Sequence, residues 1–408
     1  MIPMQQHFND ITILFPDTRL DIEKFKIQSA TQLFSEDAVA FLNALSKEII
    51  KDDLVRNFPD VATFAFFCRK ANILQIKKKY ENEDVIRLGR GIVFHVAPSN
   101  VPVNFAYSLL CGILAGNVNI VRVPSKDFEQ VSIIVNAIKR ISEKEEFKLV
   151  VEKIAFVKYN KNSSATTFFS SFCDVRVIWG GDETIAQIRK STIPARSYDV
   201  TFADRYSICI INAEEYLLEK NPEKIAQGFY NDTYLFDQNA CTAPHLVNWF
   251  GTKENVQKAK NIFWTELYKV VVQKYGSVQP VIAVDKLTAL YNQAIKSDDT
   301  RQVKTADNLL WRVEIESLTI NLVEYCCSSG YFLEYHANSL SELIPIITRK
   351  YQTIAYYGFD RYELNKFVLT EKLSGIDRIV PIGQTSNFSV IWDGFDMIKT
   401  LSRCCQII

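Results

Sequence analysis

The sequence predicts an α/β protein of two lobes, and three observations lead to that class. The chain has 408 residues, which is more than one hydrophobic core usually serves. Hydrophobic residues make up 48% of it, enough to fill two large cores. Its first half alternates short apolar runs, bounded by glycine and proline, with amphipathic stretches. That alternation is typical of parallel strands covered by helices.

Four apolar runs define the sheet of the first lobe. We expect buried strands at 91–97, 118–123, 154–157 and 175–179. Helices between them complete an open sheet of the nucleotide-binding type, although the Gly-x-Gly-x-x-Gly fingerprint is absent. In the second half, 256–272 has the periodicity of an amphipathic helix, and 285–310 is only weakly patterned.

Charge and cysteine content exclude several classes of protein. Lys+Arg and Asp+Glu both number 47, so no basic excess recommends a nucleic-acid partner. No apolar run reaches the ~20 residues of a membrane-spanning helix, and the N-terminus lacks a signal-peptide pattern. The nine cysteines form no Cys-x-x-Cys pair, and only four histidines accompany them. We therefore expect a reduced, cytoplasmic protein that holds no metal.

The segment Asp-Gln-Asn-Ala-Cys-Thr-Ala-Pro-His at 237–245 contains the strongest candidate nucleophile. Cys241 lies among small and polar residues, whereas a structural cysteine has apolar neighbours, and Pro244 prevents a continuous helix. A nucleophilic cysteine needs nearby backbone amides or dipoles and room for a substrate. The alternative is that this cysteine fills the core, as most cysteines do. His245 is a candidate local base, although its register to the thiol is open.

Candidate cofactor residues follow the predicted strands, where the ligand sites of such sheets gather. After the first strand come Pro98, Ser99 and Asn100, and the Asn100 side chain can donate to an oxyanion. Asn100 also has a purely structural interpretation, as the cap of a turn.

The other candidates lie at the ends of the second and fourth strands. At the second strand they are cationic or hydroxyl side chains, which suit a ribose or phosphate. At the fourth they are two glycines that open a helix, whose amides and dipole suit a pyrophosphate. These residues are Arg122, Ser125, Lys126, Gly180 and Gly181. The structural alternatives are that Arg122 is an ordinary exposed charge at a strand end and that the glycines form an ordinary tight turn. The order and spacing of the loops together favour a binding site.

Several of these segments resemble those of a known protein family. Three segments resemble the cofactor domain of the aldehyde dehydrogenase superfamily: Pro-Ser-Asn-Val-Pro at 98–102, Leu-Ala-Gly-Asn at 114–117 and Val-Arg-Val-Pro-Ser at 121–125. Within it the chain most resembles the acyl-CoA reductases of the LuxC type, the reductase component of bacterial fatty-acid reductase. The matching pieces are the Asn-Val-Pro loop, Ala-Cys-Thr-Ala-Pro at 240–244, Tyr-Gln-Thr at 351–353 and Trp-Asp-Gly at 392–394. The resemblance runs from about residue 88 to the C-terminus.

The resemblance implies two lobes, each with an open twisted α/β sheet, and an active site in the cleft between them. It implies an N-terminal region and cofactor domain at 1–204, a catalytic cysteine domain at 205–375, and a C-terminal segment at 376–408. That last segment is expected to oligomerise or to return to the cofactor lobe. Cys241 matches the nucleophile that takes the acyl group as a thioester. Asn100 and the Cys241 backbone amide match the oxyanion hole.

The implied reaction reduces the thioester of an acyl-CoA, or of an acylated partner protein, to an aldehyde with hydride from a nicotinamide cofactor. The family also implies a homo-oligomer and an acyl-protein synthetase as partner. One alternative is an aldehyde dehydrogenase-fold enzyme that works in the oxidative or acylating direction. Another is a catalytically silent scaffold for an acyl-activating partner, against which the presence of both Cys241 and Asn100 argues.

Two departures from the superfamily refine this expectation. Val-Thr-Phe at 200–202 runs into Ala-Asp-Arg rather than into the glutamate motif of oxidising enzymes, and Asp204 is expected to pair with Arg205. A missing water-activating base suits chemistry between thioester and aldehyde. Lys126 stands where NAD enzymes often carry a ribose-binding glutamate, and with Arg122 it favours the extra phosphate of NADPH.

Overall fold

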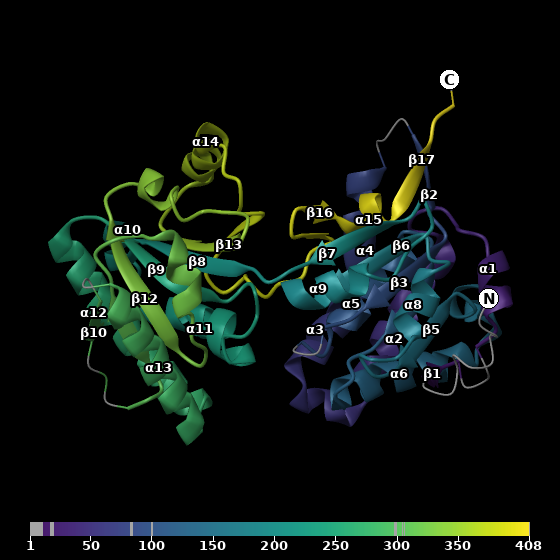
Figure 1. Ribbon diagram of the computed structural model, residues 1–408, viewed down its shortest axis with the longest axis horizontal. Coiled ribbons are helices and arrows are strands. Elements are labelled where there is room, and N and C mark those ends of the chain that lie inside the picture. Colours follow the sequence, from purple (N-terminus) through teal and green to yellow (C-terminus); the bar gives the residue numbers. More distant parts are fainter. Residues whose placement is uncertain are drawn as a thin grey trace. The chain divides into compact units, whose positions relative to one another are not determined.

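The computed structural model describes residues 11–16, 20–81, 85–98, 101–297, 300–303, 305 and 307–407. The chain forms two compact units (Figure 1). The first unit comprises the chain up to Ala203 together with Phe395–Ile408, and the second comprises Asp204–Gly394. Each contains a large sheet covered by helices, which confirms the predicted α/β class. The predicted C-terminal segment at 376–408 is thus divided between the two units.

The sheet of the first unit has six strands in the order β1-β5-β4-β3-β6-β7. Only β1 is antiparallel to its neighbour, and the other five strands run parallel. The predicted strands of the first lobe are confirmed as β3, β4, β5 and β6. The bounds are β1 (Thr12–Phe15), β3 (Ile92–Val96), β4 (Val118–Arg122), β5 (Ile154–Lys158), β6 (Val175–Trp179) and β7 (Tyr198–Phe202). Every residue of β3, β4 and β6 is buried, because helices cover both faces of the sheet.

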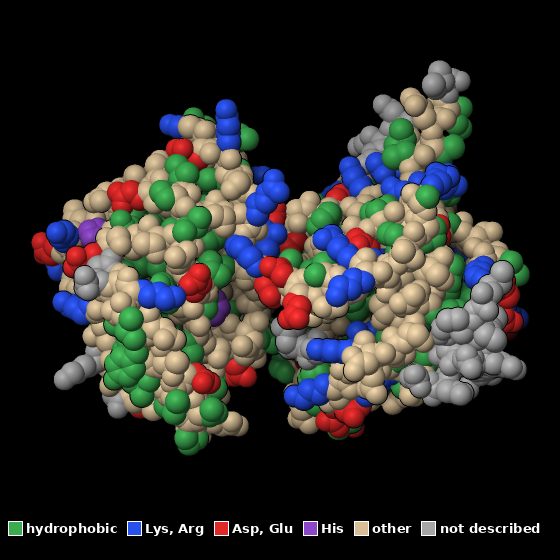
Figure 2. Space-filling model, viewed as in Figure 1, with side chains coloured by type: hydrophobic (Ala, Val, Ile, Leu, Met, Phe, Trp, Pro, Cys, Tyr) green, Lys and Arg blue, Asp and Glu red, His purple; other side chains and the backbone are tan. Residues whose placement is uncertain are grey.

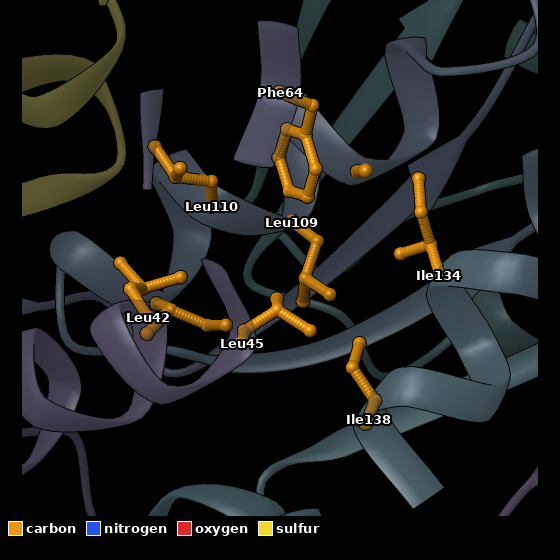
Figure 3. A pocket seen from close by; sticks show the side chains of 9 residues that line it. Leu42, Leu45, Phe64, Leu109, Leu110, Ile134 and Ile138 are labelled. Carbon is orange, nitrogen blue, oxygen red and sulfur yellow. The ribbon is translucent and has the colours of Figure 1, made fainter. Parts of the chain in front are cut away.

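Helices close both faces of this sheet. Phe25, Phe169 and Ile185 are buried on one face, and they come from α1, α8 and α9. On the other, apolar side chains of α2, α3, α5 and α6 meet around one point (Figure 3). The helices are α1 (Ile22–Ile27), α2 (Glu36–Ile50), α3 (Pro59–Phe67), α4 (Lys70–Lys77), α5 (Asn104–Leu114), α6 (Glu129–Ser142), α7 (Lys148–Val151), α8 (Ala165–Ser170) and α9 (Asp182–Arg189).

A buried histidine ties the centre of this sheet to α5. The ring nitrogens of His95, which is 0% exposed, contact Ser108 Oγ at 2.7 Å and Asn119 Oδ1 at 3.1 Å. Trp179 Nε1 donates to the same Ser108 hydroxyl at 3.2 Å. Burial lowers the pKa of His95 to about 4, although the contact with Asn119 acts in the opposite direction. The network therefore joins β3, β4, β6 and α5 around a neutral ring.

The sheet of the second unit has seven strands in the order β10-β11-β12-β9-β8-β13-β14. Only β10 is antiparallel to its neighbour. The bounds are β8 (Tyr206–Asn212), β9 (Pro244–Phe250), β10 (Arg301–Val303), β11 (Trp311–Glu314), β12 (Tyr331–Ala337), β13 (Tyr351–Tyr357) and β14 (Arg378–Pro381). Because β8, β9, β12 and β13 are parallel neighbours, their first residues lie at one edge of the sheet.

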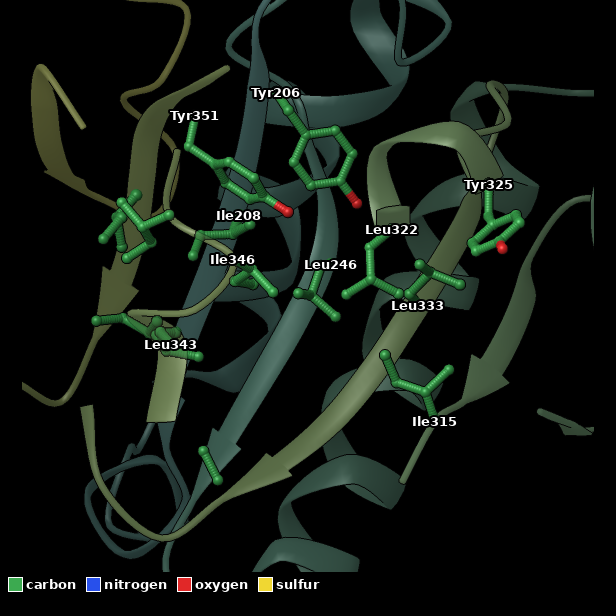
Figure 4. Packing of buried hydrophobic residues seen from close by; sticks show 14 of the residues in the cluster. Tyr206, Ile208, Leu246, Ile315, Leu322, Tyr325, Leu333, Leu343, Ile346 and Tyr351 are labelled. Atoms are coloured by element: carbon green, nitrogen blue, oxygen red, sulfur yellow. The ribbon is translucent and has the colours of Figure 1, made fainter. Parts of the chain in front are cut away.

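Two apolar layers fill the second unit. On one face the strands pack against α10 (Ala213–Leu217), α11 (Pro222–Thr233) and α12 (Lys253–Lys274). On the other they pack against α13 (Pro280–Lys296), α14 (Arg361–Glu371) and the 3-10 turns 320–325 and 340–343. Figure 4 shows this second layer, in which Tyr206 and Tyr351 lie next to each other at the start of their strands. Shorter elements are β2 (Ile86–Gly89), β15 (Ile391–Trp392), β16 (Phe395–Asp396), α15 (Met397–Thr400) and β17 (Ser402–Cys405).

No element was predicted for the weakly patterned stretch 285–310, and its first part belongs to α13. Several apolar residues of this helix face solvent, and Figure 2 shows the resulting hydrophobic patch over the helix. They are Val281, Val284, Leu287, Tyr291 and Ile295. Apolar residues on both sides of a helix blur the periodicity by which it is recognised. The helix predicted at 256–272 is confirmed as α12.

In the part of the chain that the structure describes, no helix combines the length and the apolar character that crossing a membrane requires.

We predict that His95 makes the stability of the protein fall in weak acid. Its folded pKa, about 4, lies below the ordinary value of 6.5, so the unfolded chain binds the proton more tightly. The stabilisation relative to a His95→Gln variant is therefore complete above pH 6.5 and shrinks by up to ~1.4 kcal/mol per pH unit as the pH falls to about 4.

Denaturant unfolding of both proteins at about pH 7, 6 and 5 measures this difference. The comparison cancels other titrating groups, such as the buried carboxyls of Asp232 and Asp393, whose raised pKa values act in the opposite direction. Parallel pH profiles for the two proteins would contradict the prediction.

Candidate active site

The loop that carries Cys241 is held in one backbone conformation. It begins after the 3-10 turn 234–236, where Asp237 and Gln238 take left-handed φ values of 51° and 61°. The amide of Ala243 donates to the carbonyl of Ala240 at 2.9 Å, closing a turn around the cysteine. Ser207 Oγ donates to the Cys241 carbonyl at 2.7 Å. These contacts leave the thiol as the movable part of the residue.

A buried amide side chain anchors this loop to two strands. Gln238 is 1% exposed, and its Nε2 donates to the carbonyls of Pro244 at 3.0 Å and Tyr331 at 3.1 Å. Its Oε1 accepts from the amides of Gly330 at 2.9 Å and Tyr331 at 3.1 Å. Both donor hydrogens and both acceptor positions are therefore used. Gln238 connects the cysteine loop to the first residues of β9 and β12.

Charged and polar groups of the second unit act on the Cys241 thiol. The residue is half-buried, and burial raises the pKa of its thiol to about 12. The negative charge of Asp393 acts in the same direction, whereas a hydrogen bond from the Gln352 side chain and the positive charge of Arg205 oppose it. At rest the sulfur therefore carries its proton.

Gln352 and Arg205 both contact the carboxylate of Asp393. Gln352, which is 0% exposed, donates through Nε2 to Asp393 Oδ1. A guanidinium nitrogen of Arg205 lies 3.9 Å from the same oxygen, and another lies 2.7 Å from Asp377 Oδ2. Arg205 is thus paired with Asp377 and Asp393, rather than with Asp204 as expected. Burial raises the pKa of Asp393 to about 6, although Arg205 opposes the shift.

A second arginine orders the chain that leads to Asp393. Arg378 donates to the carbonyls of Thr385 at 2.9 Å and Asn387 at 3.0 Å, and it lies over the Trp392 ring at 4.5 Å. Asp393 and Gly394 then form a turn with φ values of 51° and 77°, which confirms the turn predicted at 392–394. Such paired left-handed positions favour Asp-Gly sequences.

Sequence reasoning noticed Gln352 and Asp393 within matching segments but gave them no role. The available signal was local: a glutamine interrupts the otherwise strand-like run at 351–357, and every residue from 351 to 355 is buried. A buried amide requires partners, so a polar site at this position was open to prediction.

His245 occupies the second position of β9, after the cysteine loop. Its ring stacks on that of Tyr206, with the centroids 5.4 Å apart. Burial lowers the pKa of His245 to about 4, although backbone groups of Cys327 and Gln238 act in the opposite direction. The ring is therefore neutral at physiological pH. Its role as the local base of the thiol stays a prediction.

In the first unit, the described cofactor candidates follow three neighbouring parallel strands. Pro98 follows β3, Arg122 ends β4, and Gly181 follows β6. Since β4 and β6 flank β3, the strand order reverses beside β3, and ligands of open α/β sheets bind at such a point. Ser99 and Asn100 lie outside the described residues.

Arg122 and Lys126 differ in their surroundings. Arg122 is buried, stacks over the Tyr159 ring at 4.7 Å and donates to the Tyr159 carbonyl at 3.3 Å. Its Nε has no hydrogen-bond partner. Ser125 and Lys126 are exposed, and the Lys126 ammonium lies 5.3 Å from the centre of the Phe128 ring. Among the described residues at this edge, Arg122 thus has an unsatisfied donor and Lys126 is a solvent-facing cation.

The glycine pair is a less favourable place for an anion than the sequence suggests. The Gly180 amide already donates to the Phe202 carbonyl at 3.1 Å. Gly181 caps α9, whose first turn carries the carboxylates of Asp182 and Glu183. These charges already complement the helix dipole. A pyrophosphate contact at Gly180 and Gly181 stays a prediction.

Among the described residues, no cluster of three or more His, Cys, Asp or Glu side chains is arranged to hold a metal ion.

The two sheets and their connections define an aldehyde dehydrogenase fold. Aldehyde dehydrogenase 21 from Physcomitrella patens, solved with the reaction product succinate, aligns with a TM-score of 0.64 and 10% identity, over 94% of this chain and 86% of that one. PnpE, solved with nicotinamide adenine dinucleotide, aligns with a TM-score of 0.64 and 12% identity, over 94% of this chain and 86% of that one. At such identities the likeness concerns the fold.

The chain belongs to the acyl-CoA reductase (LuxC) family, whose model matches residues 29–404. A long-chain acyl-protein thioester reductase from Aliivibrio fischeri is 23% identical over 305 residues, which are 74% of this chain and 60% of the relative. One from Vibrio harveyi is 24% identical over 324 residues, which are 78% of this chain and 64% of the relative. The matched region thus covers less than two thirds of either relative.

We predict that iodoacetamide modifies Cys241 more slowly than the exposed Cys404 and Cys405 at neutral pH. Only a thiolate attacks the reagent, and burial with the Asp393 charge holds the pKa of Cys241 at about 12. Its rate is expected to rise about tenfold per pH unit across the alkaline range in which the fold persists. Peptide mapping by mass spectrometry follows each site. Equal rates at Cys241 and Cys404 at neutral pH would contradict this thiol environment.

Proposed function

We propose that the chain reduces an acyl thioester to an aldehyde, with Cys241 as the residue that carries the acyl group. The observation that carries the proposal is the half-buried Cys241 thiol, whose pKa is shifted by Asp393, Gln352 and Arg205, in a chain of the acyl-CoA reductase (LuxC) family. Carboxylate, amide and guanidinium groups that together shift the pKa of one half-buried thiol are typical of a reacting site rather than of core packing.

The names of the relatives support the substrate class. Both relatives are named long-chain acyl-protein thioester reductases, so an acyl-CoA or an acylated partner protein is the proposed donor of the acyl group. A homo-oligomer and an acyl-protein synthetase as partner are part of the same proposal and rest on the family resemblance alone.

In the proposed reaction, the Cys241 sulfur attacks the thioester carbonyl and the donor thiol departs. The anchored loop suits this step, because Ser207 and Gln238 hold the backbone on both sides of the thiol. Asn100 and the Cys241 amide are proposed to donate to the oxyanion, where one donor typically contributes ~10²–10³ in rate. A bound nicotinamide cofactor supplies the hydride that converts the acyl group into aldehyde.

The proposed cofactor is NADPH. The carboxyl edge of β3, β4 and β6 fits a dinucleotide, since it lies where the strand order reverses and offers the unsatisfied Arg122 Nε. The solvent-facing ammonium of Lys126 suits a phosphate at the adenosine ribose. A neighbour with this fold was solved with nicotinamide adenine dinucleotide, which supports a nicotinamide cofactor of either kind.

The reductive direction is favoured over oxidation to a free acid. Oxidising enzymes of this superfamily place a glutamate after the strand that corresponds to β7, and here Ala203 and the exposed Asp204 follow it. Without a glutamate at this position to activate water, the acyl-enzyme is expected to react with hydride or with an incoming thiol. The acylating reverse reaction, from aldehyde and thiol to thioester, uses the same residues.

The central test is an acyl adduct on Cys241. Mixing the protein with dodecanoyl-CoA, without nucleotide, should add one dodecanoyl group by intact mass, and peptide mapping should place it on Cys241. The Cys241→Ala variant should lose both the adduct and the NADPH-dependent formation of dodecanal. Cys404→Ala, a change at an exposed cysteine of β17, is the matched control and should retain both. An adduct on Cys173, Cys209 or Cys326 with Cys241 free would overturn the assignment. A parent protein that consumes no NADPH would instead favour the alternative of a catalytically silent scaffold.

We predict that Lys126→Glu weakens the use of NADPH and spares NADH. An ionic contact to phosphate is worth ~1.5–3 kcal/mol, so the ratio of kcat/KM values should shift by about tenfold or more. Lys144→Glu is the matched control, since Lys144 also lies over a phenylalanine ring but follows α6, at the opposite edge of the sheet. Equal kinetic constants for the two cofactors in the parent would end the NADPH proposal before any variant is made.

A further inference from the structure

Helix α13 turns apolar side chains outward and polar side chains inward. Its buried residues are Lys286, Leu290 and Gln293, and Lys286 is 0% exposed. The opposite side exposes large apolar residues at intervals of three or four, which form the green patch over α13 in Figure 2. An ordinary surface helix has the reverse polarity. The outward residues are called the α13 face, and they are Val281, Val284, Leu287, Tyr291 and Ile295, with exposures between 38% and 83%.

The buried lysine fixes the orientation of the helix. Lys286 Nζ donates to the carbonyls of Asn308 and Ser329, each at 2.6 Å. Burying an ammonium group is costly unless it is hydrogen-bonded, so a rotation of α13 that broke these bonds would be strongly unfavourable. The Gln293 side chain lies on the same inner side, where its Oε1 has no hydrogen-bond partner. The helix thus keeps polar groups inside and its apolar face outside, as expected where that face has a partner to bind.

The α13 face is large enough to form an interface. Its five side chains present roughly 500 Å² of surface, near the upper end of the largest apolar patch on a typical monomer. Two such faces pressed together would remove roughly 1,000 Å² from water, about the least that a specific interface between proteins buries. A second copy of the same face therefore supplies both the area and the apolar chemistry that the first copy needs.

The charges beside the face fit a second copy in one orientation. Asp285 and Lys296 are exposed, and at 3.6 residues per turn they lie on the same flank of the α13 face. The Lys296 ammonium lies 3.3 Å from Glu324 Oε2, and its side chain remains 58% exposed. If two α13 helices run antiparallel about a two-fold axis near Leu290, Asp285 of each copy lies beside Lys296 of the other. A parallel pair keeps these opposite charges apart.

We propose that the α13 face binds the α13 face of a second copy of this chain, with the two helices antiparallel. Such an interface is isologous, because each copy contributes the same residues, and it closes as a dimer. Side chains spaced by three and four residues can pack between those of the facing helix. The inference rests on the homo-oligomer of the proposed function and names the surface that joins two copies.

The first test compares the association of the parent protein with that of Tyr291→Glu. Sedimentation velocity of the full chain, from about 0.1 to 100 µM, measures the dissociation constant. Tyr291 lies within the proposed contact, so a charge there should raise this constant by ~30-fold or more. Tyr362→Glu is the matched control, because Tyr362 is an exposed tyrosine on α14 of the same unit, and it should associate as the parent does. Denaturant unfolding checks that both variants are folded.

Two results of this test would overturn the proposal. One is a parent protein that stays monomeric at about 100 µM, and the other is an assembly that Tyr291→Glu leaves unchanged. Flotation with phosphatidylglycerol vesicles examines a different occupant of the face. A monomeric parent that binds these vesicles, and a Tyr291→Glu variant that does not, would make the α13 face a lipid-binding surface instead.

A second test examines the antiparallel orientation. Asp285→Lys replaces two attractive contacts with Lys296 of the other copy by two repulsive ones, so association should weaken by about tenfold at low salt. Asp285→Asn is the matched control, because it removes the charge with little change in size, and its effect should be smaller. High salt should bring the three proteins together, since exposed charges are screened. Equal association of the parent and Asp285→Lys at low salt would overturn the antiparallel arrangement.

The outcomes distinguish this interface from the reaction proposed above. The α13 face contains none of the residues proposed to react, so Tyr291→Glu should still take a dodecanoyl group from dodecanoyl-CoA on Cys241. A parent that is acylated on Cys241 but does not associate through α13 retains the proposed reaction and overturns only the interface. A parent that associates through α13 but forms no adduct retains the interface and contradicts the proposed reaction.

Discussion

The site depends on the four hydrogen bonds of one buried amide, the side chain of Gln238. Parallel strands meet here at their first residues, before the ladder between β9 and β12 begins at Leu246 and Leu333. In that gap the amide takes the place of backbone partners and satisfies the groups at Pro244, Gly330 and Tyr331. Leaving a single buried group unsatisfied typically costs ~1–3 kcal/mol, so four together make any other loop conformation expensive.

A second constraint is the burial of charge around the thiol. Asp393 contacts the Arg205 guanidinium and the Gln352 amide, and Arg378 donates to a carbonyl of the segment that leads to Asp393. Each of these charges therefore has partners of the opposite polarity. Removing one member leaves the others uncompensated, which is why such clusters are rigid. The pKa of the Cys241 thiol responds to Asp393, Gln352 and Arg205, whose positions the fold fixes.

Local sequence patterns predicted the elements that depend on local physics. The strands β3, β4, β5 and β6 are short apolar runs with clear boundaries, and the Asp393–Gly394 turn follows from two residues that tolerate positive φ. The groups that shift the pKa of Cys241 were out of reach, since Arg205, Gln352 and Asp393 are distant from it in the sequence and act on it only in the folded chain. The pairing of Arg205 with Asp377, rather than with its chain neighbour Asp204, has the same cause. Helix α13 was missed because apolar residues occupy its exposed side.

The chain passes between the two units twice, after Ala203 and after Gly394, and each passage adjoins a charged group of the thiol site. Arg205 comes two residues after the first crossing, and Asp393 is the last residue but one before the second. The second unit therefore cannot be excised at its natural borders without placing both groups at free chain ends. An isolated unit would keep Cys241, the proposed nucleophile, and lose the tethers of the two charges that shift the pKa of its thiol, so cutting the chain at these borders would change the surroundings of the thiol.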